Sequence, residues 1–369
     1  MKRTSTALAL GLAASLALVG CVPEPDTAPS SQAPLPPETP ASTETQEPPS
    51  APSVRVLNEV VNEVSIPWGI DFFENGDALI SLRNSAELLR VTKEGEVTRL
   101  GEVPAVARDT SEGGLLGVAL DPEDEQIAYV YFTTATDNRV ARVSLSQVAN
   151  VTPIVTGIER ATNHNGGQLL FDDEGTLFIA TGDAAQTHLS QDRDSLNGKI
   201  LRVKKDGSAA DGNPFNNRVY SYGHRNVQGL AFDSAGQLWA TEFGQETTDE
   251  LNRIEAGGNY GWPDVEGEGS RGGFIDPYDS WSPTSTASPS GLEIVDDVAY
   301  IGALRGESLF AVPLTVGPET TRLLEGEYGR IRSVAQAPDG ALWITTSNTS
   351  GWTDPRPGDD RVLRVEISG

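Results

Sequence analysis

One of the three histidines in the chain has a setting suited to proton transfer. His164 lies in residues 161–171, ATNHNGGQLLF, directly ahead of an apolar run. An imidazole titrates near neutral pH, which makes His164 a candidate general base, although a turn residue bonded to the backbone is the alternative. Asp183 ends the segment that begins just after His164, and across a hairpin its carboxylate would orient the imidazole. We expect a buried structural role for His224 and a solvated one for His188.

Arginine side chains give the second chemical signal. Four of them stand beside the repeated segments described below: Arg225, Arg305, Arg330 and Arg332. Guanidinium groups bind carboxylates through paired hydrogen bonds, so four of them on converging loops predict a compact polyanionic ligand. Any single one could instead be a surface ion-pair residue, because the chain carries 53 acidic side chains.

An oxygen-rich segment is a weaker candidate for calcium. Residues 244–250, GQETTDE, form a stretch rich in side-chain and backbone acceptors. Calcium binds oxygen ligands only, and backbone carbonyls supply them whatever the side chain. The chain has no metal motif of the His/Cys type.

The candidate residues lie beside the copies of an internal repeat. Each copy has a small or apolar opening, an apolar strand, a turn with Gly or Asp, and a second apolar strand, as in GGQLLFDDEGTLFIATGDA. Further strand-like pieces such as KILRVKK lie between the copies. Successive copies start 47, 52, 61, 62 and 42 residues apart, at Pro67, Gly114, Gly166, Val227, Pro289 and Ile331.

This repeat predicts an all-β fold, a six-bladed β-propeller of four-stranded antiparallel blades. The ring would be closed by pairing VRVLNEVV near Val54 with RVLRVEI near Arg361. A pair of β-sandwiches would not give six similar copies. In a propeller the loops at one end of the strands converge on the axis, so residues at the same phase of different copies meet. Hairpin turns are expected at Asn75-Gly76, Glu174-Gly175, Ala235-Gly236 and Asp339-Gly340.

The N-terminal segment stands apart from the repeat. Lys2 and Arg3 precede an apolar run that ends in Leu-Val-Gly-Cys at Cys21, the pattern of a bacterial lipoprotein signal; an ordinary cleaved signal is the alternative. We expect residues 1–21 to be this signal, with Cys21 as the lipidated residue. Residues 22–53 would be a disordered tether rich in Pro, Ser, Thr and Glu, and residues 54–369 the propeller. The protein would then be extracytoplasmic and held at the membrane by its lipid anchor alone.

The charge balance excludes one class of partner. The formal net charge is −26, with only 27 basic residues. Nucleic-acid binding needs clustered Lys and Arg, so no nucleic-acid partner is expected.

Several longer motifs are similar to those of a known family. HNGGQLLFDDEGTLFIATGD, NGKILRVKKDG, VYSYGHRNVQGLAF, DELNRI, GGNYGWP and GALRG resemble, in this order, the soluble glucose/sorbosone dehydrogenases. These are PQQ-dependent aldose sugar dehydrogenases of the periplasmic type, and the resemblance runs from about Pro67 to Val365. It implies a propeller with PQQ at its mouth and calcium between PQQ and the protein. It also implies oxidation of the C1 hydroxyl of an aldose to the lactone, by hydride transfer to PQQ.

The resemblance implies roles for individual residues. His164 falls on the catalytic base that takes the proton of the C1 hydroxyl, and Asp183 on its orienting carboxylate. Thr284 or Thr286 would meet the cofactor. The other expected cofactor-binding residues are Arg225, Asn226, Arg305, Arg330 and Arg332.

The same resemblance implies two calcium ions. The backbone carbonyls of Gly244 and Gln245 would bind the calcium beside PQQ. Glu250 and Tyr260 match positions that bind a second, structural calcium.

Departures from the family concern the sugar. Three residues are expected to contact the substrate: Glu112, where many relatives carry Gln; Asn163, where glucose-oxidising members have Asp; and Gln228. Gly166 and Gly167 are expected to leave room for cofactor and sugar near the backbone. The short loop between Trp262 and Trp281 lacks elements that dimeric members use, which favours a monomer.

Two other functions remain as alternatives on the residues alone. One is a non-catalytic propeller that binds sugars or glycans, and the other is a calcium-dependent lactonase-type hydrolase. The hydrolase needs acidic side chains that converge on the axis, whereas the axis candidates here are mostly Arg, Asn and His. This difference favours a polyanionic cofactor over a bare metal site.

Overall fold

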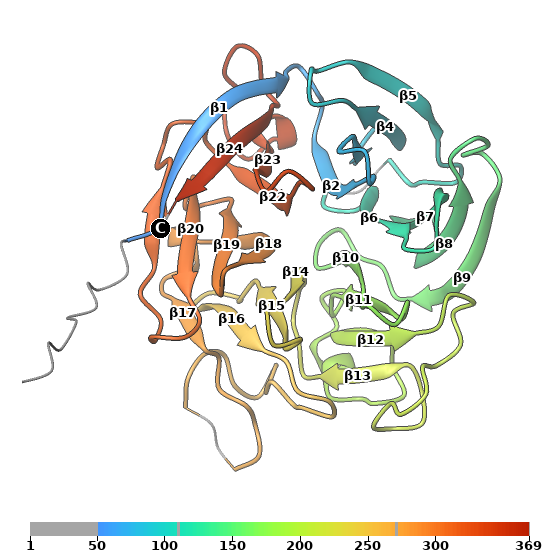
Figure 1. The fold of residues 1–369 in the computed structure, drawn as a ribbon. Helices are drawn as coiled ribbons and strands as arrows, with labels where there is room; N and C mark the ends of the chain where they lie inside the picture. Colours follow the sequence, from blue (N-terminus) through green and yellow to red (C-terminus); the bar gives the residue numbers. More distant parts are fainter. Residues whose placement is uncertain (1–50, 109–110, 270–271, 369) are drawn as a thin grey trace, which may run out of the picture. The chain divides into compact units, whose positions relative to one another are not determined.

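The computed structural model describes residues 51–108, 111–269 and 272–368. Within these residues, strands form six four-stranded antiparallel sheets arranged in a ring around a central axis (Figure 1). The prediction of a six-bladed β-propeller is therefore confirmed. The expected signal segment, Cys21 and nearly all of the expected tether lie outside the described residues.

The first three blades follow the chain in order. Blade 1 contains β2 (Pro67–Phe72), β3 (Ala78–Leu82), β4 (Glu87–Val91) and β5 (Val97–Glu102). Blade 2 contains β6 (Leu115–Asp121), β7 (Asp124–Thr133), β8 (Asn138–Ser144) and β9 (Val151–Ile158). Blade 3 contains β10 (Gly166–Phe171), β11 (Leu177–Thr181), β12 (Lys199–Val203) and β13 (Val219–Tyr222), with the 3-10 helix η1 (Thr187–Ser190) between β11 and β12.

The last three blades complete the ring. Blade 4 contains β14 (Val227–Phe232), β15 (Leu238–Glu242), β16 (Asp249–Arg253) and β17 (Asp279–Trp281). Blade 5 follows the 3-10 helix η2 (Thr284–Thr286) and contains β18 (Pro289–Val295), β19 (Val298–Ala303), β20 (Ser308–Pro313) and β21 (Thr321–Leu323). Blade 6 contains β22 (Ile331–Gln336), β23 (Leu342–Thr346), the 3-10 helix η3 (Asn348–Ser350), β24 (Val362–Ser368) and β1 (Ser53–Val61).

Blade 6 joins the two ends of the described chain. β1 pairs antiparallel with β24 from Ser53 opposite Ser368 to Val61 opposite Val362, as Figure 1 shows. The pairing of the first and last strands confirms the expected closure. It also satisfies backbone groups that an open ring would leave exposed at two sheet edges.

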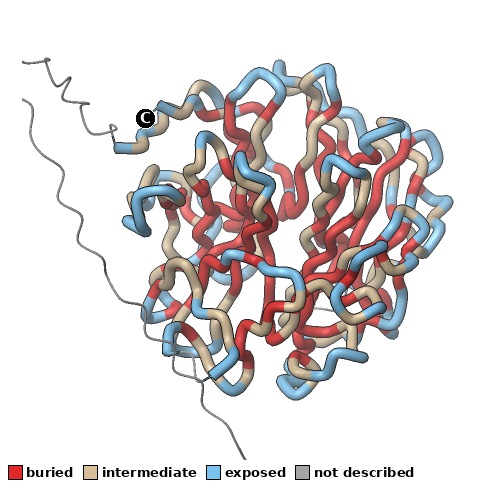
Figure 2. Tube along the Cα trace, turned by 60° about the horizontal axis from the view of Figure 1, so that its bottom comes forward, coloured by how far each residue is buried: buried red, intermediate tan, exposed pale blue. Residues whose placement is uncertain are grey.

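Apolar side chains fill the space between neighbouring blades. One buried cluster combines Tyr129 and Tyr131 of β7 with Ile179 of β11 and Leu201 of β12. Figure 2 shows the same arrangement, with buried strands inside the ring and exposed residues concentrated in the connecting loops. Because each sheet is covered on both faces by its neighbours, the strands read as continuous apolar runs rather than as alternating ones.

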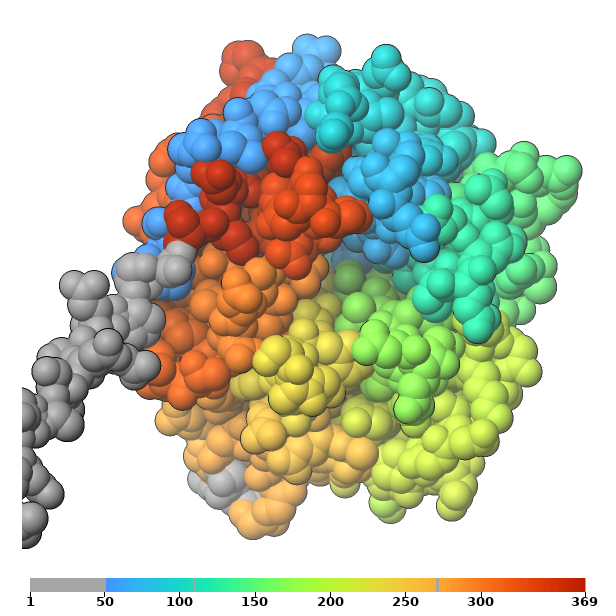
Figure 3. Space-filling view, viewed as in Figure 1, coloured from blue at the N-terminus to red at the C-terminus, as the bar shows by residue number. Residues whose placement is uncertain are grey.

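The innermost strands of adjacent blades approach each other closely around the axis. A Cβ atom at Gly117 of β6 would lie 2.2 Å from the carbonyl oxygen of Gly167 in β10. At Gly291 of β18 it would lie 2.7 Å from Cα of Ser333 in β22. These contacts explain the glycine that recurs in the first strand of the first five copies; the sixth has Ser333 instead. The centre of the ring is nevertheless hollowed between the blades, as the space-filling view shows (Figure 3).

The hairpin turns close each first pair of strands as expected, with positive φ at Gly76, Gly175, Gly236 and Gly340. Loops that enter the first strand of each blade therefore lie with loops that leave the second strand, at one end of the ring. Among the described residues, no helix has the length and apolar composition needed to cross a bilayer.

Candidate active site

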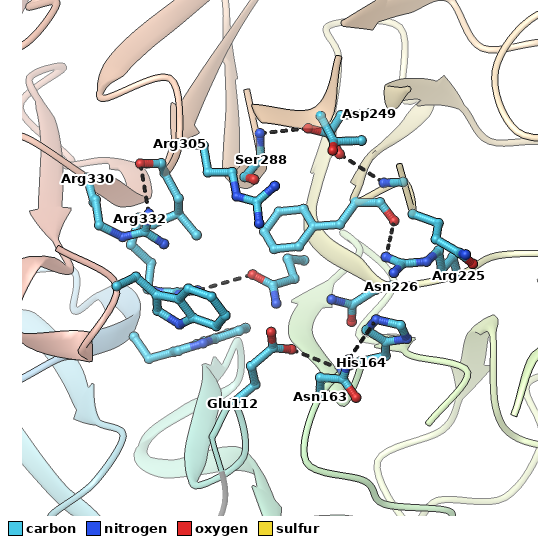
Figure 4. Close-up of a pocket in the computed structure, with 18 of the residues that line it drawn as sticks. Glu112, Asn163, His164, Arg225, Asn226, Asp249, Ser288, Arg305, Arg330 and Arg332 are labelled. Atoms are coloured by element: carbon cyan, nitrogen blue, oxygen red, sulfur yellow. Dashed lines mark hydrogen bonds between the residues drawn. The ribbon is translucent and has the colours of Figure 1, made fainter. Parts of the chain in front are cut away.

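A pocket lies where the inner strands begin. Its wall combines residues that precede inner strands, such as Glu112 and His164, with residues that follow second strands, such as Arg83 and Arg305. Figure 4 shows these side chains turned toward a common space from several blades. The repeat phase thus brings together residues as far apart in the sequence as Glu112 and Arg332, as the sequence predicted.

His164 is held with its ring at the pocket wall. Its backbone has φ +56°, a left-handed conformation that is uncommon for residues other than Gly. Its backbone N–H donates to Glu112 Oε2 at 2.9 Å, while Nδ1 lies 2.8 Å from Asp183 Oδ1. The other ring nitrogen, Nε2, lies 3.1 Å from Asn163 Nδ2. Strained backbone geometry of this kind is common at catalytic positions, because surrounding contacts must hold it.

Asp183 accepts hydrogen bonds through both carboxylate oxygens. The backbone N–H of Ala185 donates to Oδ1 at 2.7 Å, and Trp262 Nε1 donates to Oδ2 at 2.9 Å. The side chain is fully buried. A carboxylate that already accepts from two N–H groups favours a donor on His164 Nδ1, which leaves a lone pair on Nε2 toward the pocket. The predicted pairing of His164 with Asp183 is therefore confirmed.

The pocket also carries a concentration of positive charge. Five arginines line the pocket against two acidic side chains, Glu112 and Asp249. Burial and the neighbouring guanidinium groups lower the pKa of Arg332 to about 9 and that of Arg330 to about 10. The arginines are Arg83, Arg225, Arg305, Arg330 and Arg332. Crowded cations in a protein of strongly negative net charge indicate a site for an anion.

Several residues that line this pocket carry a buried donor without a hydrogen-bond partner among the described residues. These donors are Nε of Arg225, Nδ2 of Asn226 and Nε of Arg330. Leaving a buried donor unpaired costs about 1–3 kcal/mol, so native structures rarely retain one without a ligand or water to accept from it. A planar ligand with several carboxylates, such as PQQ, fits this donor set.

The remaining guanidinium contacts fix the arginines in place. Arg332 Nη1 donates to Gln228 Oε1 at 3.1 Å, and its guanidinium lies 5.6 Å from the ring centre of Trp68. Arg225 Nη1 donates to the carbonyl oxygen of Phe243 at 3.0 Å. Gln228 and Asn226 line the pocket as predicted, and Gln228 is occupied with Arg332 rather than free.

Gly244 and Gln245 line the same pocket. Their backbone N–H groups donate to carboxylates, Gly244 to Asp249 Oδ1 at 2.9 Å and Gln245 to Glu266 Oε1 at 2.7 Å. Neither carbonyl accepts a hydrogen bond from the residues described. Two free carbonyls on a pocket wall fit the expected calcium ligands.

Glu250 and Tyr260 lie in a small neighbouring cavity, together with Glu242 and Glu266. Burial and the nearby Glu242 raise the pKa of Glu250 to about 8. The Tyr260 hydroxyl is fully used, since it donates to the Arg253 carbonyl oxygen at 2.6 Å and accepts from the Glu255 N–H at 2.8 Å. Only the Tyr260 backbone carbonyl is left for a cation, and no cluster of three or more metal-binding side chains occurs among the described residues.

Other expectations have clear outcomes. His224 is buried, with Nδ1 2.8 Å from Glu242 Oε2, and His188 is exposed, both as predicted. Of the two threonines, Thr284 lines the pocket and Thr286 is not among the residues that line it. The expectation for the glycine pair was wrong: the protein itself fills the space beside Gly166 and Gly167, against Thr181 and Leu116.

Sequence reasoning missed several residues of this site. Arg83 comes directly after β3, one position closer to its strand than Asp183 is to β11 or Arg305 to β19, so a search of the residues just after each second strand would have found it. Asp249 stands beside the predicted Glu250, and burial raises its pKa to about 6 although the N–H groups of Gly244 and Ser288 bind it. Trp262 lies in the GGNYGWP motif, but nothing in the sequence indicates that its Nε1 donates to Asp183.

Comparison with known proteins shows which family this fold and pocket belong to. Residues 64–353 match the family model described as glucose / sorbosone dehydrogenase. The PQQ-bound aldose sugar dehydrogenase of Streptomyces coelicolor superposes with a TM-score of 0.83 at 46% identity, over 87% of this chain and 100% of that one. A Thermus thermophilus oxidoreductase described as a glucose dehydrogenase has a TM-score of 0.79 at 37% identity, over 85% of this chain and 100% of that one. The aldose sugar dehydrogenase YliI of Escherichia coli is 30% identical over 82% of this chain and 92% of its own length.

Proposed function

Because the chain belongs to the glucose/sorbosone dehydrogenase family, we propose that it is a PQQ-dependent aldose sugar dehydrogenase with His164 as its general base. One observation carries the proposal. An imidazole fixed by a buried carboxylate faces a pocket in which arginines present unpaired donors. A base and a polyanion site in one pocket are what this chemistry requires.

The chain's own residues would act on the sugar as follows. His164 Nε2 carries the lone pair that accepts the proton of the C1 hydroxyl. The Asp183 carboxylate stabilises the imidazolium that results and keeps Nε2 directed at the pocket. Asn163 Nδ2, now bonded to Nε2, is the contact that the hydroxyl would replace.

The anion-binding wall would hold the cofactor. Arg225, Arg330 and Arg332 would bind its carboxylates, with Asn226 and Arg305 beside them. PQQ would supply the quinone that accepts the hydride, and the carbonyls of Gly244 and Gln245 would hold a Ca²⁺ ion that serves as a Lewis acid. The Glu112 carboxylate, whose Oε2 accepts a hydrogen bond from the His164 N–H, would also accept hydrogen bonds from the sugar.

The alternative functions have less support. A calcium-dependent hydrolase needs converging carboxylates, whereas this pocket has five arginines and two acids. A glycan-binding propeller needs no paired base and no unpaired arginine donors.

The test adds PQQ and Ca²⁺ to the purified protein without cofactor and follows aldose-dependent reduction of an artificial dye. We expect turnover on at least one aldose of a panel. His164→Gln should lower kcat by about 10²–10⁴-fold, as removing a general base does, while PQQ absorbance is retained. His188→Gln, which changes an exposed histidine, is the matched control. A protein that retains PQQ but oxidises no aldose would contradict the enzyme assignment, and a fully active His164→Gln would contradict the base.

We further propose that the protein is an extracytoplasmic lipoprotein attached through Cys21, on the sequence pattern alone. Replacing Cys21 by Ser should move the protein from the membrane fraction to the soluble fraction. Retention in the membrane fraction would contradict the anchor.

A further inference from the structure

Trp262 lies at the junction of the base and the anion-binding wall. It belongs to the connection between β16 and β17 of blade 4, whereas Asp183 follows β11 of blade 3. Its backbone is held at both ends: its N–H donates to the Gly223 carbonyl oxygen at 2.9 Å, and its carbonyl oxygen accepts from Gln191 Nε2 at 2.8 Å. The side chain is buried. A tryptophan fixed in this way can position whatever it touches.

The indole N–H of Trp262 completes the contacts of Asp183. Oδ1 faces His164 and the Ala185 N–H, and Oδ2 receives only the indole at 2.9 Å among the hydrogen bonds of the described residues. Without that donor, Oδ2 would be a fully buried acceptor without a partner, and the carboxylate would be free to rotate away from the imidazole. The indole therefore sets the direction from which Asp183 meets His164.

The indole ring also supports the nearest arginine of the pocket. The Arg225 guanidinium carbon lies 5.4 Å from the ring centre of Trp262, within the range of a cation–π contact. Arg225 has one side-chain hydrogen bond among the described residues, to the Phe243 carbonyl oxygen, and its Nε has none. Its position in the pocket thus depends strongly on the ring.

We infer that Trp262 is a positioning residue that fixes the general base and the anion-binding arginine relative to each other. It acts through Asp183 with its N–H and through Arg225 with its ring face. This inference rests on the proposed function for its kinetic consequences, while its structural consequences for His164 do not.

The chain offers a matched control for the N–H. Trp239 of β15 is also buried, and its Nε1 also donates to an aspartate oxygen at 2.9 Å, Asp233 Oδ2. Its ring packs against Tyr278 and its aspartate lies in a hairpin turn, outside the pocket. Trp262→Phe and Trp239→Phe therefore remove the same kind of bond at two places.

The kinetic experiment compares these two variants loaded with PQQ and Ca²⁺. Trp262→Phe keeps a ring under Arg225 and loses the donor, so kcat should fall about 10- to 100-fold while KM and PQQ affinity stay near the wild-type values. Trp239→Phe should keep the wild-type kcat, although its melting temperature should fall about as much as that of Trp262→Phe. Trp262→Leu should lower PQQ affinity as well. Equal kinetics of Trp262→Phe and Trp239→Phe would overturn the inference.

A second measurement needs neither cofactor nor sugar. The chain has three histidines, so ¹⁵N spectra of the imidazole rings can be assigned with His164→Gln. In Trp262→Phe the His164 ring signals should change and broaden, while those of His224, bonded to Glu242, should not. Unchanged His164 signals would overturn the inference even if the protein proved to have no dehydrogenase activity.

A third measurement uses the unsubstituted protein, in case Trp262→Phe does not fold. The indole N–H signal of Trp262 should shift with pH at the same midpoint as the His164 ring, because Asp183 bonds both groups. The indole signal of Trp239 should not follow that midpoint. Independent behaviour of Trp262 and His164 would contradict the coupling.

Discussion

The two ends of the inner strands bury charges of opposite sign. Where these strands begin, Arg332 lies among other arginines in the pocket, and burial lowers its pKa to about 9. Where they end, Asp71 of β2 and Glu293 of β18 line a second cavity, and burial raises their pKa values to about 6 and about 7. Both ends therefore carry a cost for buried charge.

The difference lies in how the buried groups are paired. Asp71 accepts from the backbone N–H groups of Leu120 and Phe72, at 2.7 and 2.8 Å. Glu293 accepts from that of Gln336 in the next blade at 3.1 Å. At the arginine end, buried donors remain unpaired.

The carboxylates at the acidic end are thus paired within the protein, because backbone N–H groups of neighbouring blades bind them. The arginine end is complete only with a ligand that supplies acceptors. Substitutions at the first end should change stability, and substitutions at the second should change ligand binding.

The largest expected effect is at the arginine end. Arg332→Met should lower PQQ affinity about 100-fold, because it removes a buried cation that would form charge-assisted bonds worth about 1.5–3 kcal/mol. The ligand-free protein should lose little stability, since relief from the neighbouring Arg83 and Arg330 offsets the lost bonds to Gln228 and Ser290. Titration of PQQ absorbance and thermal melting measure the two quantities.

Arg364→Met provides the control, because Arg364 pairs with Asp339 in the turn between β22 and β23, outside the pocket. Its PQQ affinity should equal that of the wild type. If Arg332→Met bound PQQ as tightly as Arg364→Met, the contrast between the two ends would fail.

The sequence predicted the blades and the site that they form, but not the contacts between loops of different blades. Repeats of apolar strands with fixed turns predicted the blades, and their phase predicted that His164, Asp183 and the arginines meet. The pairing of β1 with β24 followed from two strands left over at the ends. These features depend on local pattern, which one sequence contains in full.

Other features depend on how loops from different blades meet. Trp262 lies in a long connection with no counterpart of that length in the other copies, so no phase rule reaches it. The pairing of Asp249 with the Gly244 and Ser288 N–H groups depends on loop conformations that residue types do not specify. The acidic end was missed because Asp71 and Glu293 read as ordinary polar residues at the ends of strands.

The charge beside the general base can be changed by Asn163→Asp. The new carboxylate would stand beside His164 Nε2, where Asn163 Nδ2 now lies at 3.1 Å, and a nearby negative charge favours a protonated imidazole. Since the base acts in its neutral form, the acid limb of the kcat/KM profile should move up by about one pH unit. Activity should therefore fall more at acidic than at alkaline pH.

The full pH profile on one aldose measures this shift. Asn163→Gln keeps the amide and should leave the limb in place. A uniform loss of activity at all pH values in Asn163→Asp would show that charge beside the base is not the cause.

The smallest expected effect is at the acidic end. The pKa of Glu293 in the folded protein, about 7, lies above its ordinary value of 4.5, so between these pH values the folded state holds more protons than the unfolded chain. Stability from this group is therefore present below about pH 4.5, falls as pH rises, and is lost above about pH 7. Glu293→Gln removes this titration. The melting temperature of the variant minus that of the wild type should therefore be about 2–4 °C higher at pH 8 than at pH 5.

Thermal melting across this pH range measures the gain, with Glu319→Gln, a change at an exposed acid, as the control. PQQ affinity should be unaffected, because the two cavities lie at opposite ends of the inner strands. A difference in melting temperature that stays constant with pH would mean that Glu293 acts through its hydrogen bond to Gln336 alone. A loss of PQQ affinity would mean that the two ends are coupled through the inner strands, and that the acidic end is more than a junction between blades.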